Sequence, residues 1–166
     1  MSAPHLTSPH LADVVGWREW VGLPAQGVDW VKAKIDTGAR TSSLHAFALE
    51  EIDRDGEPWV RFEIHPWQRS AADAVTVTRP VLDRRQVRSS SGHEEERVVV
   101  SLDVRLLDRV VPAEVTLARR DEMGFRMLVG RELLRQGFLV DASASYLGGR
   151  PRLAVRRANR GRGHGA

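Results

Sequence analysis

The chain has 166 residues, contains no cysteine and carries a formal net charge of +3. This length corresponds to about one domain. The lack of cysteine excludes disulfides, thiolate zinc sites and cysteine nucleophiles. No apolar run approaches the roughly 18 residues of a membrane helix, and the first residues do not have the pattern of a secretory signal. We therefore expect a cytoplasmic protein with no membrane partner.

The positive charge is concentrated at the C-terminal end. After Asp141 the chain contains six arginines and no acidic residue, whereas residues 1–141 contain 19 basic and 22 acidic residues. We expect a flexible leader over residues 1–14, a folded domain over 15–142 and a basic, disordered tail over 143–166. Tyr146 is the one aromatic residue in that tail, so the tail offers few side chains on which nucleic-acid bases could stack. A nucleic-acid partner is therefore not expected.

Most of the predicted elements are strands. Alternating apolar and polar residues, with turn residues between them, predict strands over 17–23, 28–36, 47–52, 59–64, 75–81, 97–107, 110–117 and 138–141. Asp55-Gly56 is typical of a hairpin turn. A single helix is predicted over 130–136, because Gly137 follows it as a C-cap. This pattern favours an all-β fold, a closed barrel or sandwich with one short C-terminal helix.

The tripeptide Asp36-Thr37-Gly38 begins at the last residue of the strand predicted over 28–36. The strand delivers an acidic side chain to a turn, and Gly38 lets the backbone pass close to other atoms. Alone, this is a weak signal, because an aspartate in an ordinary turn accepts hydrogen bonds from nearby backbone N–H groups.

A second segment, residues 127–141, strengthens the functional interpretation of Asp36-Thr37-Gly38. Met127-Leu128-Val129-Gly130-Arg131-Glu132-Leu133-Leu134 lies some ninety residues later and is followed by Phe138-Leu139-Val140-Asp141. An apolar run, a glycine and a short helix in this order resemble the segment that follows the Asp-Thr-Gly strand in retroviral-type aspartic peptidases. In those enzymes the segment passes beside the catalytic loop, and the glycine leaves room for it.

Four motifs resemble one bacterial family more closely: Trp17–Pro24, Lys32–Ala46, Val87–Gly92 with Glu96-Arg97, and Leu128–Arg131. This is the family of retropepsin-like aspartic endopeptidases, also labelled ATP-dependent zinc proteases and associated with RimK-type ATP-grasp ligases. The resemblance covers roughly residues 15–142. It implies a retropepsin-like fold and a peptidase that acts on a polypeptide.

The resemblance also implies a catalytic role for Asp36, Thr37 and Gly38. An aspartic peptidase needs two carboxylates that share one proton, and the chain has one Asp-Thr-Gly. The second Asp36 must then come from another copy, which predicts a two-fold homodimer. Thr37 would form a hydrogen bond across the interface, and the Gly38 N–H would point to the carboxylate.

Other residues are expected to bind the substrate or support the loop. By position, residues 88–96 resemble a flap, with Arg88, Ser90 and Gly92 against the substrate, although an exposed polar hairpin is equally consistent with them. Arg40, Arg88 and Arg97 would bind an acidic substrate, for example a glutamate-rich tail of the kind that RimK-type ligases append. Gly130 and Arg131 are expected to be structural.

The residues give little support to a cofactor. The chain has six histidines but no His-Glu-x-x-His. His45 is a weak candidate for a zinc ligand, and no cofactor is expected. No Gly-x-x-x-x-Gly-Lys loop is present, so ATP dependence would have to come from a partner. Two alternatives stay open: a zinc-dependent peptidase that uses Asp36 and His45, and a non-catalytic module that binds acidic peptides or a ligase through its arginines.

Overall fold

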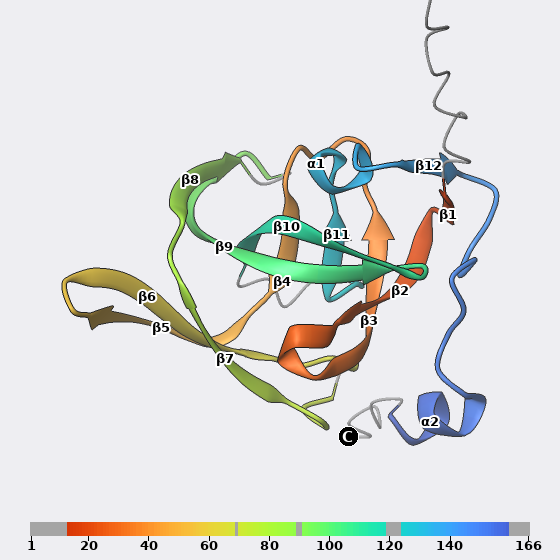
Figure 1. Ribbon diagram of the computed structural model, residues 1–166, viewed down its shortest axis with the longest axis horizontal. Helices are drawn as coiled ribbons and strands as arrows, with labels where there is room; N and C mark the ends of the chain where they lie inside the picture. Colours follow the sequence, from red (N-terminus) through yellow and green to blue (C-terminus); the bar gives the residue numbers. More distant parts are fainter. Residues whose placement is uncertain (1–12, 69, 89–90, 119–123, 160–166) are drawn as a thin grey trace, which may run out of the picture.

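The computed structural model describes residues 13–68, 70–88, 91–118 and 124–159. These residues form twelve strands, two short helices and one 3-10 turn (Figure 1). In chain order they are β1 (Asp13–Gly16), β2 (Arg18–Leu23), η1 (Pro24–Gln26), β3 (Val28–Ile35), β4 (Ser42–His45), β5 (Phe47–Arg54), β6 (Glu57–Ile64), β7 (Val75–Pro80), β8 (Asp83–Arg88), β9 (Glu94–Leu106), β10 (Arg109–Ala118), β11 (Met127–Val129), α1 (Arg131–Leu134), β12 (Phe138–Asp141) and α2 (Leu153–Ala158).

The largest sheet has seven strands in the order β10-β4-β11-β3-β2-β9-β8. Because β10 also pairs with β9, six of these strands follow one another in a ring. The register between β2 and β9 consists of the single pair Gly22 and Arg105, so a full ladder does not close the ring. The all-β prediction is confirmed, but the sheets do not form the closed barrel that the sequence favoured.

Two smaller sheets complete the fold. Strands β5, β6 and β7 form an antiparallel sheet, and the β5–β6 hairpin extends away from the ring (Figure 1). Strands β1 and β12 pair in parallel, with Val14 opposite Leu139. This pairing brings the strand after α1 beside the first described residues of the chain.

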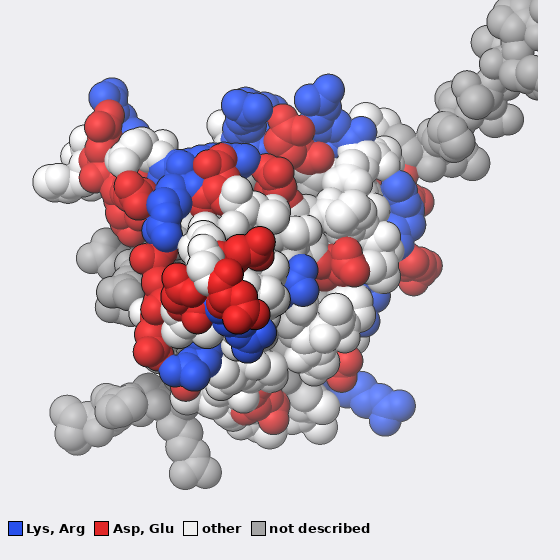
Figure 2. Space-filling view, turned by 60° about the vertical axis from the view of Figure 1, so that its left-hand side comes forward, with Lys and Arg blue, Asp and Glu red and all other residues white. Residues whose placement is uncertain are grey.

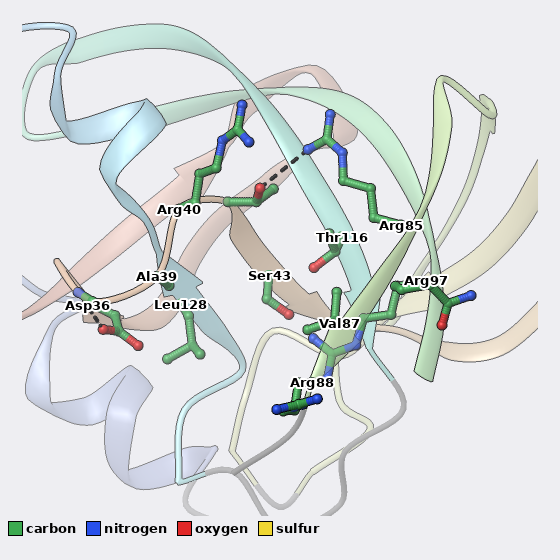
Figure 3. A pocket seen from close by; sticks show the side chains of 13 residues that line it. Asp36, Ala39, Arg40, Ser43, Arg85, Val87, Arg88, Arg97, Thr116 and Leu128 are labelled. Carbon is green, nitrogen blue, oxygen red and sulfur yellow. Dashed lines mark hydrogen bonds between the residues drawn. The ribbon is translucent and has the colours of Figure 1, made fainter. Parts of the chain in front are cut away.

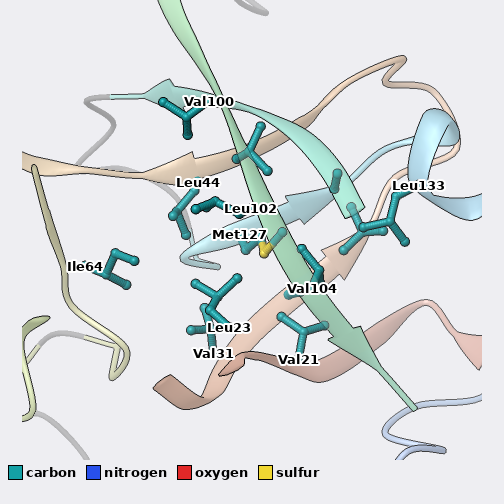
Figure 4. Close-up of a cluster of buried hydrophobic side chains, with 14 of the residues drawn as sticks. Val21, Leu23, Val31, Leu44, Ile64, Val100, Leu102, Val104, Met127 and Leu133 are labelled. Atoms are coloured by element: carbon teal, nitrogen blue, oxygen red, sulfur yellow. The ribbon is translucent and has the colours of Figure 1, made fainter. Parts of the chain in front are cut away.

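The core lies inside the ring. Along β3 the side chains of Val31, Ala33 and Ile35 are buried, while Lys32 and Lys34 between them face outward. This period of two follows from strand geometry. Valine and leucine side chains from the surrounding strands, together with Met127, pack against the buried face of β3 and fill the core (Figure 4). Burying each such side chain stabilises the fold by about 1.5–3 kcal/mol.

Several elements were not expected from the sequence: β1, β4, β8, β11 and α2. Strand β4 is rich in serine, yet it pairs with β10 on one side and β11 on the other. Strand β8 is mostly charged and pairs with β9 from Asp83 opposite Val99 to Arg88 opposite Glu94. These strands are specified by their neighbours rather than by their own propensities.

The first residues of the expected tail form backbone hydrogen bonds with the first strands. Residues 143–149, assigned to a disordered tail, pack against the first strands: the Trp17 N–H donates to the Ala144 carbonyl at 2.9 Å, and the Tyr146 N–H donates to the Arg18 carbonyl at 2.9 Å. The helix α2 follows, so the described chain has a second short helix beyond the predicted one. Residues 1–12 of the leader expected over 1–14, and the last residues, 160–166, lie outside the described residues, while Asp13 and Val14 belong to β1. In the described part of the chain no helix combines the length and the apolar character needed to cross a membrane.

Candidate active site

Asp36 lies directly after β3, at the start of the loop to β4. Its N–H donates to the Val129 carbonyl at 2.8 Å, which continues the parallel pairing of β3 with β11. The Gly38 N–H donates to the Asp36 Oδ1 atom at 3.0 Å. The carboxylate is only partly buried, while Thr37 and Gly38 are exposed. The loop therefore holds a carboxylate in a defined orientation at the surface of the chain.

Gly130 passes directly beneath this loop. A Cβ atom on Gly130 would lie 2.7 Å from the carbonyl carbon of Thr41 and 3.0 Å from the carbonyl oxygen of Ala39. The Gly130 N–H donates to the buried Ser42 Oγ atom at 3.0 Å. No side chain fits here, so the glycine allows the two segments to touch.

The first turn of α1 supports the same loop. The Arg131 N–H donates to the Ala39 carbonyl at 2.8 Å, and the Glu132 N–H donates to the Arg40 carbonyl at 3.0 Å. The Arg131 guanidinium donates from Nη1 to the carbonyls of Thr37 and Gly38, both at 3.0 Å. Arg131 thus binds two successive backbone carbonyls of the loop.

A cavity of about 530 Å³ opens beside Asp36 (Figure 3). Its lining comes from the loop after β3, from β8, and from single residues of β4, β9, β10 and β11. Four arginines lie in this lining: Arg40, Arg85, Arg88 and Arg97. Among the described residues that line the cavity, Asp36 is the one carboxylate, so arginines outnumber carboxylates in the lining.

The arginines differ in their surroundings. Arg97 is buried, with 5% of its side chain exposed, and its Nη2 atom lies 3.9 Å from Glu95 Oε2. Arg40 and Arg88 are 78% and 73% exposed and contact Glu132 and Glu94. Because exposed pairs of this kind hold their partners weakly, Arg40 and Arg88 are the more adaptable groups, whereas Arg97 is fixed in the wall.

Arg85 was not identified from the sequence, since it lies in a charged strand that carries no motif. Its guanidinium contacts Glu114 at 2.7 Å, Asp83 at 3.0 Å and the Thr41 hydroxyl at 3.2 Å. The hydrogen bond to Glu114 is the main cause that raises the pKa of Arg85. The Arg84 N–H, and then Arg85, lower the pKa of Asp83. Arg85 ties the cavity wall to the loop at Thr41.

The residues predicted for the flap are only partly placed. Ser90 lies outside the described residues. Gly92 lies in the β8–β9 connection with a φ of 86°, a conformation that favours glycine, but it is not among the residues that line the cavity. Arg88 lines the cavity from the end of β8.

His45 is placed away from the cavity lining. It is buried in β4, its ring stacks on Phe47 with centroids 4.2 Å apart, and Phe47 stacks in turn on His65 at 3.7 Å. Within the described ranges, no three His, Asp or Glu side chains gather as metal ligands. Structural and catalytic zinc sites use three or four such donors. The described residues therefore do not fit the zinc centre that the label of the similar family implies.

The comparisons with known proteins agree with this geometry. The family model described as "RimB-like: Retropepsin-like aspartic endopeptidase RimB" matches residues 14–151. The chain belongs to the RimB-like family. The match includes β3, the Asp36 loop, β11 and α1, and the retropepsin-like fold expected from the sequence is confirmed.

Relatives and a solved structure extend the comparison. Proteins named probable alpha-L-glutamate ligase from Shewanella pealeana and Desulfotalea psychrophila are 44% and 42% identical over 133 and 128 residues, covering 80% and 77% of this RimB-like chain. The chain spans under a third of their length, 29% and 28%. A Legionella pneumophila protein of unknown function shares the fold with a TM-score of 0.70 and 26% identity, covering 82% of this chain and 98% of that one.

Proposed function

We propose that this RimB-like chain is an aspartic-type peptidase whose active site contains two copies of Asp36, one from each subunit of a homodimer. The observation that carries the proposal is the placement of Asp36. Its carboxylate accepts a hydrogen bond from the Gly38 N–H and lines a cavity of about 530 Å³, and the loop that carries it packs against Gly130.

The chemistry follows from two carboxylates held close together. Two such groups about 3 Å apart cannot both ionise easily, so they share one proton. The ionised member takes a proton from water as the water attacks the scissile carbonyl, and the protonated member donates to the carbonyl oxygen. The dyad titrates as a pair, so neither apparent pKa belongs to one residue.

The second carboxylate requires a second copy of the chain. The described residues contain one Asp-Thr-Gly loop, and its Thr37 and Gly38 are exposed rather than covered by the rest of the fold. A two-fold axis beside Thr37 would bring the two loops together and complete the site. Under this proposal the Thr37 hydroxyl forms hydrogen bonds across the axis.

The substrate that suits the cavity is an acidic polypeptide. The fixed charge of Arg97, with Arg85, Arg40 and Arg88 around it, attracts carboxylates. The relatives named as glutamate ligases support a glutamate-rich chain as substrate and a RimK-type ligase as partner. Both assignments belong to the proposal.

The test is to replace Asp36 with Asn and to follow cleavage of a glutamate-rich peptide by mass spectrometry. We expect the loss of turnover with an unchanged fold. Asp53→Asn is a matched control, because Asp53 Oδ1 also accepts a backbone N–H in a turn, that of Gly56 at 2.8 Å, and lies in the β5–β6 hairpin. Cleavage by Asp36→Asn at the parental rate would overturn the mechanism.

The excess of arginine in the cavity also favours a second candidate, a non-catalytic module that grips acidic chains. That candidate requires binding of the glutamate-rich peptide without cleavage by the parent protein. Equal affinity of the parent and Asp36→Asn, together with no cleavage by either, would select it over the peptidase.

A further inference from the structure

A row of side chains runs from the cavity across the main sheet, from the buried Thr116 and Ser43 to the exposed Lys34. Registered partners on neighbouring strands point to the same face. The register pairs Thr116 with Ser43, Ser43 with Leu128, Leu128 with Lys34 and Lys34 with Arg18. The first three residues of this row line the cavity (Figure 3). The row therefore extends beyond the cavity to two basic residues, Lys34 on β3 and Arg18 on β2.

Beyond Lys34 the same face carries a cluster of cations around one ring. The Tyr146 ring has Arg18 Cζ at 4.8 Å, Lys32 Nζ at 6.0 Å and Arg150 Cζ at 5.4 Å from its centroid. In the part of the chain that the structure describes, none of these three cations forms an ion pair with an acidic side chain. Three like charges around one ring repel one another, and a bound anion would relieve that repulsion.

Basic residues on another face have a different environment. Arg61 pairs with Glu50, and Arg84 pairs with Glu51 and Glu96. Figure 2 shows red and blue side chains next to each other over much of the face it presents. The cations around Tyr146 are thus distinguished by the absence of such counter-ions among the described residues.

The cluster is built into the fold by a buried carboxylate. Glu19 has no exposed surface and accepts hydrogen bonds from the N–H groups of Gly16, Leu147 and Gly148 at 2.8, 3.0 and 2.9 Å. The Tyr146 N–H donates to the Arg18 carbonyl. These contacts hold Tyr146 over β2 and β3, so the position of its ring does not depend on a ligand.

We propose that this surface, formed by Arg18, Lys32, Lys34 and Arg150 around Tyr146 and called here the basic face, binds an acidic polypeptide as an extension of the substrate cavity. The inference rests on the proposed function and adds a second binding region to it. Lys32 precedes Asp36 by four residues, so the two lie about 13 Å apart along the strand, a span that about four extended peptide residues cover.

The aromatic residues favour a polypeptide over a nucleic acid. Single-stranded nucleic acids bind where bases stack on free aromatic rings. Here the Trp20 ring contacts the rings of Trp67 and Tyr146, with centroids 6.0 and 6.4 Å apart, and cations already surround the Tyr146 ring. The basic face offers charge at fixed positions rather than open stacking platforms.

The experiment measures binding rather than cleavage. Fluorescein-labelled oligo-L-glutamate of about twelve residues, long enough to cover the cavity and the basic face, is mixed at low salt with increasing amounts of the 166-residue chain carrying Asp36→Asn, and binding is followed by fluorescence anisotropy. In that background, Lys32→Gln with Lys34→Gln is expected to weaken the Kd by about fivefold, because the two charges lie at a solvent-accessible rim. Arg150→Gln is a second, single variant at an exposed position and is expected to weaken the Kd in the same direction.

The matched control is Arg54→Gln. Arg54 also lies over an aromatic ring, that of Trp59 at 4.5 Å, but belongs to the β5–β6 hairpin. We expect it to leave the Kd unchanged. Circular dichroism and thermal melting verify the fold of each variant. If the double lysine variant and Arg150→Gln, both folded, bind the peptide as the Asp36→Asn parent does, the basic face has no role and the proposal is overturned.

Lys32 and Lys34 are the only lysines in the chain, which gives an independent readout. A carbodiimide that joins amines to carboxylates is expected to crosslink one of them to the oligo-L-glutamate, and peptide mapping identifies which. Crosslinks confined to the N-terminal amine would contradict the proposal.

A single-stranded oligo-dT of similar charge is titrated in parallel. If it binds as tightly as the peptide and loses affinity equally in the double lysine variant, the proposal of an acidic polypeptide is overturned in favour of a nucleic acid. The two proposals also fail separately. Cleavage by Asp36→Asn would end the aspartic mechanism, whereas unchanged binding in the folded double lysine and Arg150→Gln variants would remove the basic face and leave the mechanism in place.

Discussion

Gly130 and Thr41 touch through their backbones: a Cβ atom added to Gly130 would lie 2.7 Å from the Thr41 carbonyl carbon. This contact joins the segment before α1 to the loop that carries Asp36. The Thr41 atoms in this contact belong to the main chain. A change of the Thr41 side-chain rotamer therefore cannot relieve the strain of a side chain added at Gly130.

We predict that Gly130→Ala destabilises the fold by about 1–3 kcal/mol, the range of an overpacked interior, and displaces the Asp36 loop. Chemical denaturation measures the free energy of unfolding. Gly124→Ala is the control, because nothing lies within 4 Å of a Cβ at that position and its φ is not in the left-handed range. Equal stability of the two variants would show that the loop and the Gly130 segment are free to separate.

Arg131 is predicted to act as a positioning residue for the loop. Arg131→Gln removes two hydrogen bonds to the carbonyls of Thr37 and Gly38, each worth about 0.5–1.5 kcal/mol. We expect a loss of kcat on a glutamate-rich peptide that exceeds the change in KM, because the loop orients the carboxylate. Arg135→Gln, whose exposed guanidinium contacts the side chain of Glu132 at 3.6 Å, serves as the control. A change in KM alone would contradict this assignment.

Glu19→Gln tests the anchor of residues 143–149. The carboxylate accepts N–H bonds from Gly16 and Leu147 on one oxygen and from Gly148 on the other. A glutamine keeps one acceptor oxygen, but its NH2 group cannot accept, so at least one of these N–H groups loses its acceptor. Leaving a buried N–H without its acceptor costs about 1–3 kcal/mol. Hydrogen exchange is expected to show faster exchange at residues 146–149, whereas Glu57→Gln, at an exposed position, leaves exchange there unchanged. Unchanged protection in Glu19→Gln would contradict the proposed anchoring.

The Asp83–Arg85 pair predicts a pH dependence in the acid range. The Arg84 N–H and Arg85 lower the pKa of Asp83 below its ordinary value of 3.8. A lowered folded-state pKa means that the stabilising contribution is complete above pH 3.8 and is lost as the pH falls through the folded-state value. Asp83→Asn is therefore expected to be slightly less stable than the parent near neutrality and equal to it at lower pH. If the difference in unfolding free energy between the parent and Asp83→Asn increased as the pH is lowered, this prediction would be contradicted.

The proposed dimer predicts that activity depends on protein concentration. If each site contains two Asp36 carboxylates, the activity per chain falls on dilution below the dimer dissociation constant. Analytical ultracentrifugation provides that constant independently. Constant activity per chain across a dilution series that converts dimer to monomer would show that one carboxylate suffices.

The linear pattern of residues predicts the local features of this protein. Alternation along residues 28–36 predicts a strand with Val31, Ala33 and Ile35 on one face, and the structure shows that this face is buried. The position of Asp36 after that strand and the apolar run before Gly130 are also visible in the sequence, because each depends on residues only a few positions apart.

Only the tertiary structure shows which distant residues share a surface. Arg85 enters the cavity wall through the pairing of β8 with β9, and Tyr146 reaches Arg18 across more than a hundred residues. Strand β4 exists because β10 and β11 supply partners on both its sides. Local periodicity determines which face of a strand is buried. Sheet register and the long-range hydrogen bonds of Glu19 determine what gathers on the opposite face, and neither leaves a local signal in the sequence.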